Sequence, residues 1–424
     1  MPGFELPTRK AMTLDDAWVN FDPQTPLPPN HPFYVARGEN PLDELVWSLR
    51  QEVGRAPKYF FAGHRGCGKS TELARLAAHS GINMHYWPVQ FSVRDKCDFN
   101  DLNYVEVLLA LAAQMYVDFT EQGGRMAKDL LAELEGWKDR TVEKLTAKGA
   151  VFETGAGFDL GKFFLTALAK VQTEHTTRQI IRQEFRPRVS ELIARINLIA
   201  AQIQATTKRN VLVIIEDLDK IPLEQARVLF SDAYQVLVQP AVTVVYTVPV
   251  ALYFSPAYTP IREQGFFLPN VKLHAREDRQ KRHRAGYRAM REFVLKRMDT
   301  PLIAPRALNA AIRLSGGIFR EASYVMQTAI ARAALRKADR VTPADVREAE
   351  SRIRNSFRRI LTADDRAVLR EVWQTRELRD PERLAPLLHL LAAIEYRNDE
   401  NWCDVHPALE PLLAEEGEEG QGNG

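Results

Sequence analysis

One short segment combines glycine, lysine and serine in a spacing suited to phosphate chemistry. An apolar run ends at Gly63, four residues follow, and Gly68, Lys69 and Ser70 come next. Glycines let the backbone curl so that its N–H groups point at phosphate oxygens, lysine adds a positive charge, and a serine hydroxyl can hold Mg²⁺. Good helix formers come after Ser70, so a helix N-terminus would face the same phosphates and the segment predicts a nucleoside triphosphate site. The expected binding residues are Gly63, His64, Arg65, Gly66, Cys67, Gly68, Lys69, Ser70 and Thr71, with Ser70 also a metal ligand.

A second set of candidate residues follows the apolar run 211–215. Five consecutive apolar, mostly β-branched residues predict a strand buried on both faces, as in a parallel sheet. Carboxylates just beyond such a strand lie where ligands bind in open α/β sheets. Glu216 is therefore expected to hold Mg²⁺, and Asp217 or Asp219 to orient the attacking water. Asp217 is favoured as the base, and Asp219 is its alternative.

The spacing between these two segments predicts a large insertion. From Lys69 to Glu216 is 147 residues, whereas two strand–helix units need only about 60. The surplus has helical periodicity and is expected to form an insertion at about 100–207. Beyond it, another buried strand should end at Thr247, a polar residue shortly before a proline.

Composition describes an ordinary globular chain. The 424 residues are 45% hydrophobic and 26% charged, and a net charge of +2 is too small to indicate nucleic acid by itself. The cysteines lack metal-ligand spacing, and one lies inside the glycine-rich loop, which fits a reducing cytoplasm. No apolar run is long enough to span a bilayer. The expected location is cytoplasmic, without a membrane contact.

The remaining patterns predict the domain order. Prolines in residues 1–32 exclude a regular element there and indicate an extended arm, followed by a phosphate-loop core at 33–298. All-helical periodicity indicates a lid at 299–361, and a helix–helix–hairpin pattern at 362–412 is typical of a winged helix. The acidic, glycine-rich tail 413–424 is expected to be disordered.

The order of these elements resembles that of AAA-type ATPases. Within that group the chain is similar to bacterial signal-transduction ATPases with numerous domains (STAND), including those of antiphage defence. The resemblance implies an α/β fold: a parallel-sheet P-loop NTPase core with a helical insertion, an all-helical lid and a small winged-helix domain. It also implies ATP and Mg²⁺ as ligands.

The resemblance assigns roles to four further residues. Arg37 would help to enclose the adenine, although a solvated Arg–Glu pair is the simpler interpretation. Thr247 would contact the γ-phosphate or the water, or only cap the next turn. Arg320, after a glycine pair, would bind the γ-phosphate from the lid, or pair with Glu321. Arg262 would complete a neighbouring subunit's site, or be an ordinary surface arginine.

Two functions follow from the sequence. The first is an ATP-hydrolysing switch that assembles as a homo-oligomer and controls a separate effector protein. The alternative is a DNA-acting initiator or loader that uses the winged helix and the basic stretch 272–297. The second winged-helix helix carries few basic side chains, so nucleic acid is not favoured. An ATP-binding scaffold without turnover is a third interpretation.

Overall fold

The computed structural model describes residues 6–152, 157–253, 259–397 and 401–414. The chain forms two compact units, each built from separate segments. The loop unit comprises Met1–Pro41, Ala62–Arg75 and Phe267–Gly424, and the sheet unit comprises Leu42–Phe61 and Leu76–Phe266. The predicted tail lies mostly outside the described residues, and the predicted domain boundaries stay predictions.

The sheet unit contains most of a five-stranded sheet in the order β2-β3-β4-β1-β5. β2 pairs with β3 and β3 with β4, both in parallel, as predicted from the apolar run 211–215. That run is buried throughout. The apolar pattern Val271-Lys272-Leu273 predicts the last strand of this sheet, and this prediction is wrong, because the last strand of the sheet ends at Phe267. The strands are β1 Lys58–Gly63, β2 Tyr86–Ser92, β3 Asn210–Glu216, β4 Thr243–Pro249 and β5 Gly265–Phe267.

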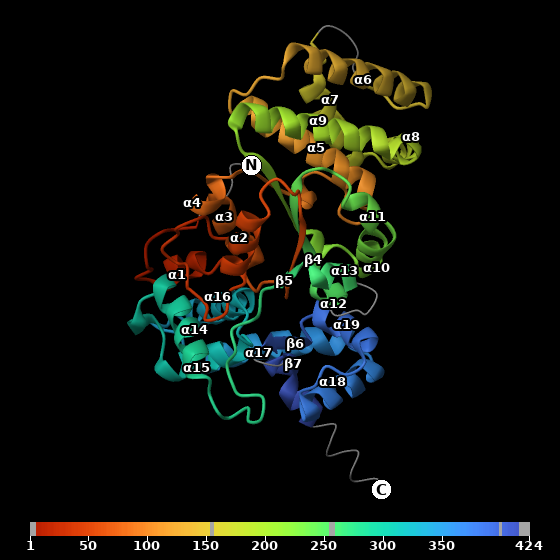
Figure 1. The fold of residues 1–424 in the computed structure, drawn as a ribbon. Helices are drawn as coiled ribbons and strands as arrows, with labels where there is room; N and C mark the ends of the chain where they lie inside the picture. Colours follow the sequence, from red (N-terminus) through yellow and green to blue (C-terminus); the bar gives the residue numbers. More distant parts are fainter. Residues whose placement is uncertain (1–5, 153–156, 254–258, 398–400, 415–424) are drawn as a thin grey trace. The chain divides into compact units, whose positions relative to one another are not determined.

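The predicted insertion is a bundle of helices in the sheet unit (Figure 1). Its buried side includes an ion-pair network in which Arg182 contacts Glu106 at 2.6 Å and Arg178 contacts Asp98 at 2.7 Å. Buried charges of this kind are retained only when paired. The helices are α5 Tyr104–Glu121, α6 Lys128–Ala147, α7 Leu160–Thr173, α8 His175–Phe185 and α9 Val189–Thr207.

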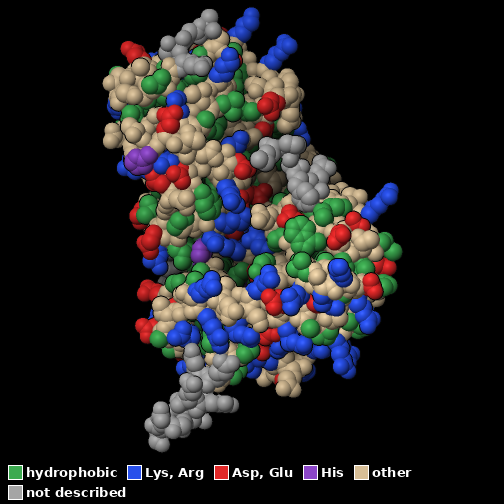
Figure 2. Space-filling view, turned by 180° about the vertical axis from the view of Figure 1, so that it is seen from behind, with side chains coloured by type: hydrophobic (Ala, Val, Ile, Leu, Met, Phe, Trp, Pro, Cys, Tyr) green, Lys and Arg blue, Asp and Glu red, His purple; other side chains and the backbone are tan. Residues whose placement is uncertain are grey.

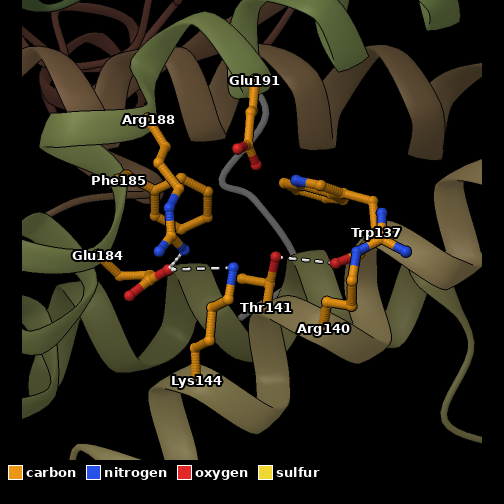
Figure 3. A pocket seen from close by; sticks show the side chains of 8 residues that line it. All are labelled: Trp137, Arg140, Thr141, Lys144, Glu184, Phe185, Arg188 and Glu191. Atoms are coloured by element: carbon orange, nitrogen blue, oxygen red, sulfur yellow. Dashed lines mark hydrogen bonds and ion pairs between the residues drawn. The ribbon is translucent and has the colours of Figure 1, made fainter.

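A small pocket lies between α6 and the α8–α9 junction (Figure 3). Trp137 and Phe185 form its apolar part. Its buried carboxylate, Glu184, pairs with Arg188 and lies 4.0 Å from Lys144. Because these contacts of Glu184 join α6 to the α8–α9 junction, we assign the pocket to the packing of the insertion.

The loop unit contains the helices that follow the sheet. Thr342 and Asp345 form a capping box at the start of the helix that begins at Pro343. The first of these helices, α14, contains much of the basic stretch 272–297. The helices are α14 Arg284–Arg297, α15 Pro305–Leu314, α16 Phe319–Leu335 and α17 Pro343–Ile360.

The C-terminal module has the predicted helix–helix–hairpin order. Tyr396 and Trp402 stack across its antiparallel strands with ring centroids 4.7 Å apart. The predicted turn at 398–400 lies outside the described residues. The elements are α18 Ala363–Thr375, α19 Pro381–His389, β6 Ala393–Arg397 and β7 Asn401–Val405.

The N-terminal arm is not entirely irregular. α1 (Leu14–Asn20) lies in it, so the expectation that prolines exclude a regular element from residues 1–32 is wrong there. The stretch between Pro7 and Pro23 contains no proline, and Thr13 caps the helix by accepting a hydrogen bond from the Asp16 N–H. The remaining helices are α2 Leu42–Gln51, α3 Lys69–Ala78, α4 Ser80–Asn83, α10 Leu223–Arg227, α11 Tyr234–Leu237, α12 Val250–Tyr253 and α13 Thr259–Glu263.

Candidate functional site

The glycine-rich loop has the curled backbone that its sequence predicts. Gly66 and Gly68 have φ angles of +81° and +108°, which side-chain-bearing residues rarely adopt. A Cβ atom on Gly66 would lie 2.4 Å from the Cβ of Arg320, and one on Gly68 would lie 2.8 Å from Nη2 of Arg37. These two glycines are therefore required both by the backbone conformation and by close neighbours.

Lys69 begins α3 and lies within this loop. Its side chain is buried, and Nζ donates to the carbonyl oxygens of Gly63 at 2.8 Å and His64 at 2.9 Å. Carbonyl oxygens are modest partners for an ammonium group, and phosphate oxygens are stronger ones. The ammonium group is thus held at the loop by contacts that an anionic ligand can replace.

Arg320 and Arg37 both contact the loop backbone. The Arg320 N–H donates to Gly66 O at 3.2 Å, and its Nε donates to Pro23 O at 3.2 Å. No ion pair joins Arg320 to Glu321 in the described part of the chain, so the simpler alternative for Arg320 does not hold.

Arg37 donates to Cys67 O at 2.5 Å and to Pro269 O at 2.9 Å. Its guanidinium also lies 5.1 Å from the Phe319 ring centroid. It also pairs with the Glu72 carboxylate at 3.8 Å, and only 5% of the Arg37 side chain and 1% of the Glu72 side chain are exposed. The Arg–Glu pair is therefore buried and not solvated, and the contacts of Arg37 stabilise the loop.

The loop also contacts the C-terminal module, which the sequence analysis did not foresee. The His64 ring is fully buried, and its Nε2 accepts a hydrogen bond from the Glu395 N–H at 2.9 Å. Burial, followed by the charge of Lys69, lowers the pKa of His64 to about 3, so the ring is neutral. Next to it, Arg65 donates to His389 Nε2 at 2.7 Å.

The first turn of α3 is tied to the N-terminal arm. Thr71 Oγ1 accepts from the Leu27 N–H at 3.1 Å. The buried Glu72 carboxylate accepts from the Tyr34 hydroxyl at 3.2 Å and pairs with Arg75 at 2.6 Å. The sequence analysis missed Glu72, although a buried acidic residue in the first turn of a helix is a common N-terminal feature.

In the sheet unit, the predicted carboxylates lie at the end of β3 with side-chain partners on β2. Glu216 Oε1 accepts from Gln90 at 2.6 Å, and Asp217 Oδ2 accepts from the Ser92 hydroxyl at 2.7 Å. Asp217 also pairs with Lys220. Its φ of +68° is left-handed, a conformation that Asp tolerates better than most residues. Asp219, the alternative base, is buried.

Thr247 contacts the same strand end. Its buried hydroxyl donates to Ile215 O at 3.1 Å and accepts from the Leu218 N–H at 3.1 Å. It therefore fixes the turn that carries the carboxylates, and both its donor and one acceptor position are used within the protein.

Arg262 lies on α13 and is exposed, with Nη2 bonded to Thr259 at 3.2 Å. An exposed arginine agrees equally with both predictions for this residue. Among the described residues no helix is long and apolar enough to cross a membrane. Within the same residues no group of three or more His, Cys, Asp or Glu side chains is arranged to hold a metal ion.

Comparison with known proteins gives structural matches only. No family model matches the chain, and no curated protein matches it. The ORC2 protein of Aeropyrum pernix, solved as ADPNP–ADP complexes, is 12% identical with a TM-score of 0.44, covering 91% of this chain and 96% of that one. Cdc6p of Pyrobaculum aerophilum is 11% identical with a TM-score of 0.44, covering 96% and 98%. Drosophila ORC bound to DNA is 12% identical with a TM-score of 0.42, covering 97% and 95%.

Such values are too low for a function to be transferred. They give no support to the narrower assignment to signal-transduction (STAND) or antiphage-defence ATPases.

Proposed function

We propose that this chain binds and hydrolyses ATP. The observation that carries the proposal is the loop around Lys69, in which a buried ammonium group lies among left-handed glycines at the start of a helix. Backbone N–H groups, a helix N-terminus and a lysine together suit a polyphosphate better than any other common ligand. Arg320, held against Gly66, is a further cation beside the loop.

Each proposed role follows from the chemistry of the side chain. Lys69 exchanges its carbonyl contacts for phosphate oxygens, and Arg320 adds a charge that stabilises the transferred phosphoryl group. Mg²⁺ fits the residues present, because the Ser70 hydroxyl and the Glu216 carboxylate are the hard oxygen ligands that it prefers. When bound, the ion neutralises charge on the phosphates. Asp217 positions the attacking water and accepts its proton.

Substitution of Lys69 tests the proposal. Lys69→Ala should weaken ATP binding at least about 100-fold, or roughly 3 kcal/mol, because it removes the buried positive charge from the loop. Isothermal titration calorimetry with ATP measures this.

Lys58→Ala is a matched control for this substitution. Lys58 is also a buried lysine that donates to a backbone carbonyl, that of Ala56 at 2.6 Å. Its substitution should leave ATP affinity unchanged. Normal ATP affinity in Lys69→Ala would sink the proposal.

A second candidate function is binding to nucleic acid, and one surface favours it. Figure 2 shows that Lys and Arg side chains are frequent on the face of the loop unit seen in that view. On α14 and the turn before it, five exposed cations have no ion-pair partner among the described residues. We call these residues the basic cluster: Lys281, Arg282, Arg284, Arg288 and Arg291.

The winged helix itself is a weaker candidate for nucleic acid binding. On α19, Arg383 is the exposed basic residue, and its other exposed side chains in the described chain are apolar or acidic. We therefore propose that the surface for nucleic acid is α14, whose basic side chains contact the phosphate backbone. Titration with duplex DNA at two salt concentrations tests this, because phosphate contacts impose a steep salt dependence. Control of a separate effector, homo-oligomer assembly and the role of Arg262 stay predictions.

A further inference from the structure

The basic cluster presents several cations on one side of a single helix. Arg284, Arg288 and Arg291 follow one another at spacings of four and three residues, which places them on one face of α14. Arg282, just before the helix, lies 4.9 Å from the Tyr287 ring centroid. Three acidic residues lie close to the cluster in sequence: Glu277, Asp278 and Glu292, of which Glu292 pairs with Lys296 at 2.9 Å. The five cations of the cluster therefore keep a positive excess.

The C-terminal end of the described chain lies beside this region. Glu410 pairs with Arg313 of α15 at 3.1 Å, and α15 packs against α14. Burial raises the pKa of Tyr287 on α14, and the charges of Arg282 and Arg313 oppose that rise. Arg313 lies in the last turn of α15, so Glu410 is held on a helix that packs against α14. The described chain ends four residues after Glu410, at residue 414.

The residues that follow are strongly acidic. Glu415, Glu416, Glu418 and Glu419 occur within five positions, and no lysine or arginine occurs from residue 398 to residue 424. Five residues of extended chain reach about 17 Å. The carboxylates are thus tethered near a surface of opposite charge.

We propose that the acidic segment 415–419 docks on the basic cluster and occupies it in competition with nucleic acid. A single exposed ion pair contributes little, about 0–1 kcal/mol. Four carboxylates on a short tether act together, because the effective concentration of a tethered segment is of millimolar order. Salt screens these charges, since the Debye length is about 8 Å at physiological ionic strength. The docking does not depend on ATP hydrolysis, and it gives the second candidate function a built-in competitor.

A double-mutant cycle in the full chain tests the competition. One change replaces Glu415, Glu416, Glu418 and Glu419 by Gln, and the other replaces Arg284, Arg288 and Arg291 by Gln. Binding of a short fluorescent DNA duplex is measured by anisotropy at about 50 mM and about 200 mM salt. Replacing the four glutamates should raise the affinity for the DNA duplex about 5- to 10-fold at the lower salt concentration and less than about 2-fold at the higher one. With the cluster neutralised, the tail change should have no effect. An equal gain in both backgrounds would show that the tail acts elsewhere and would overturn the proposal.

Carbodiimide cross-linking gives a measurement that needs no DNA. This reagent joins a carboxylate to a lysine in direct contact with it, and Lys281 is the lysine of the cluster. Mass spectrometry should find Lys281 joined to the segment 415–419 at low salt, with less product at high salt. Lys281→Arg keeps the charge and should abolish the product. Absence of the cross-link in the unchanged chain would refute the docking. A cross-link without DNA binding would leave the docking in place and remove the second candidate function.

Discussion

The loop around Lys69 and the carboxylates after β3 are held in different ways. Lys69 donates to the backbone carbonyls of Gly63 and His64. Asp217 contacts side chains, Ser92 on one oxygen and Lys220 on the other. Backbone contacts follow from the local shape of the loop. A side-chain contact can be removed by a substitution that leaves the backbone unchanged. The geometry of the carboxylates therefore depends on the residues that supply these contacts. The loop should therefore respond most to backbone changes, and the carboxylates most to side-chain changes.

The largest expected effect is on the carboxylate side. Asp217→Asn keeps a side chain that tolerates the left-handed backbone and can still accept from Ser92. It removes the proposed base, so single-turnover hydrolysis should slow about 10²- to 10⁴-fold while ATP binding is retained.

Asp219→Asn is the matched comparison for Asp217→Asn. It should leave the hydrolysis rate within a few-fold of the unchanged protein, because Asp217 remains. The opposite pattern, normal hydrolysis in Asp217→Asn and loss in Asp219→Asn, would assign the base to Asp219.

The same contrast explains which features of the structure can be predicted from the sequence and which cannot. The curled backbone of the glycine loop and the buried strand β3 depend on patterns within a few residues, and these two predictions are confirmed. The β2 partners of Glu216 and Asp217, which are Gln90 and Ser92, lie 126 and 125 positions away in the chain. No local pattern identifies such partners.

The His64 contact with Glu395 spans 331 positions and was missed for the same reason. The helix α1 was missed for another reason, since the flanking prolines outweighed a local cap at Thr13. The individual roles of the site residues stay predictions, because each depends on a bound ligand.

Among backbone changes on the loop side, the strongest expected effect comes from Gly66→Ala. The new methyl group would lie 2.4 Å from the Arg320 Cβ, so the loop or the start of α16 has to move. We expect ATP affinity to fall about 10- to 100-fold, or roughly 1.4–2.8 kcal/mol.

Gly54→Ala separates this contact from backbone strain. Gly54 has nearly the same φ, +83°, but no atom lies within 4 Å of the position of its new methyl group. It should lose about 1–2 kcal/mol of stability and keep its ATP affinity. Equal ATP affinity in the two variants would mean that the Arg320 contact is unimportant.

The smallest expected effect is a change in how the stability of the folded protein depends on pH, and it comes from the buried His64 ring. Its pKa is lowered to about 3 in the folded protein, against an ordinary value of 6.5 in the unfolded chain. Between these values the unfolded chain binds more protons, so His64 stabilises the fold fully above pH 6.5 and progressively less as the pH falls. From pH 7 to pH 5 the loss is about 2 kcal/mol.

His64→Gln removes this dependence while keeping an oxygen that can accept from the Glu395 N–H. The Glu395 carboxyl is also fully buried, and burial raises its pKa well above the ordinary value. Its contribution has the opposite sign, because the folded protein then binds more protons, and stability falls as the pH rises. Glu395 is present in both proteins, so its contribution cancels when the two are compared. Urea unfolding at pH 7 and pH 5 should therefore show a difference in stability between the unchanged protein and His64→Gln that shrinks by about 2 kcal/mol at the lower pH. A difference that stays constant would mean that the ring is solvated and that the loop does not hold it against β6.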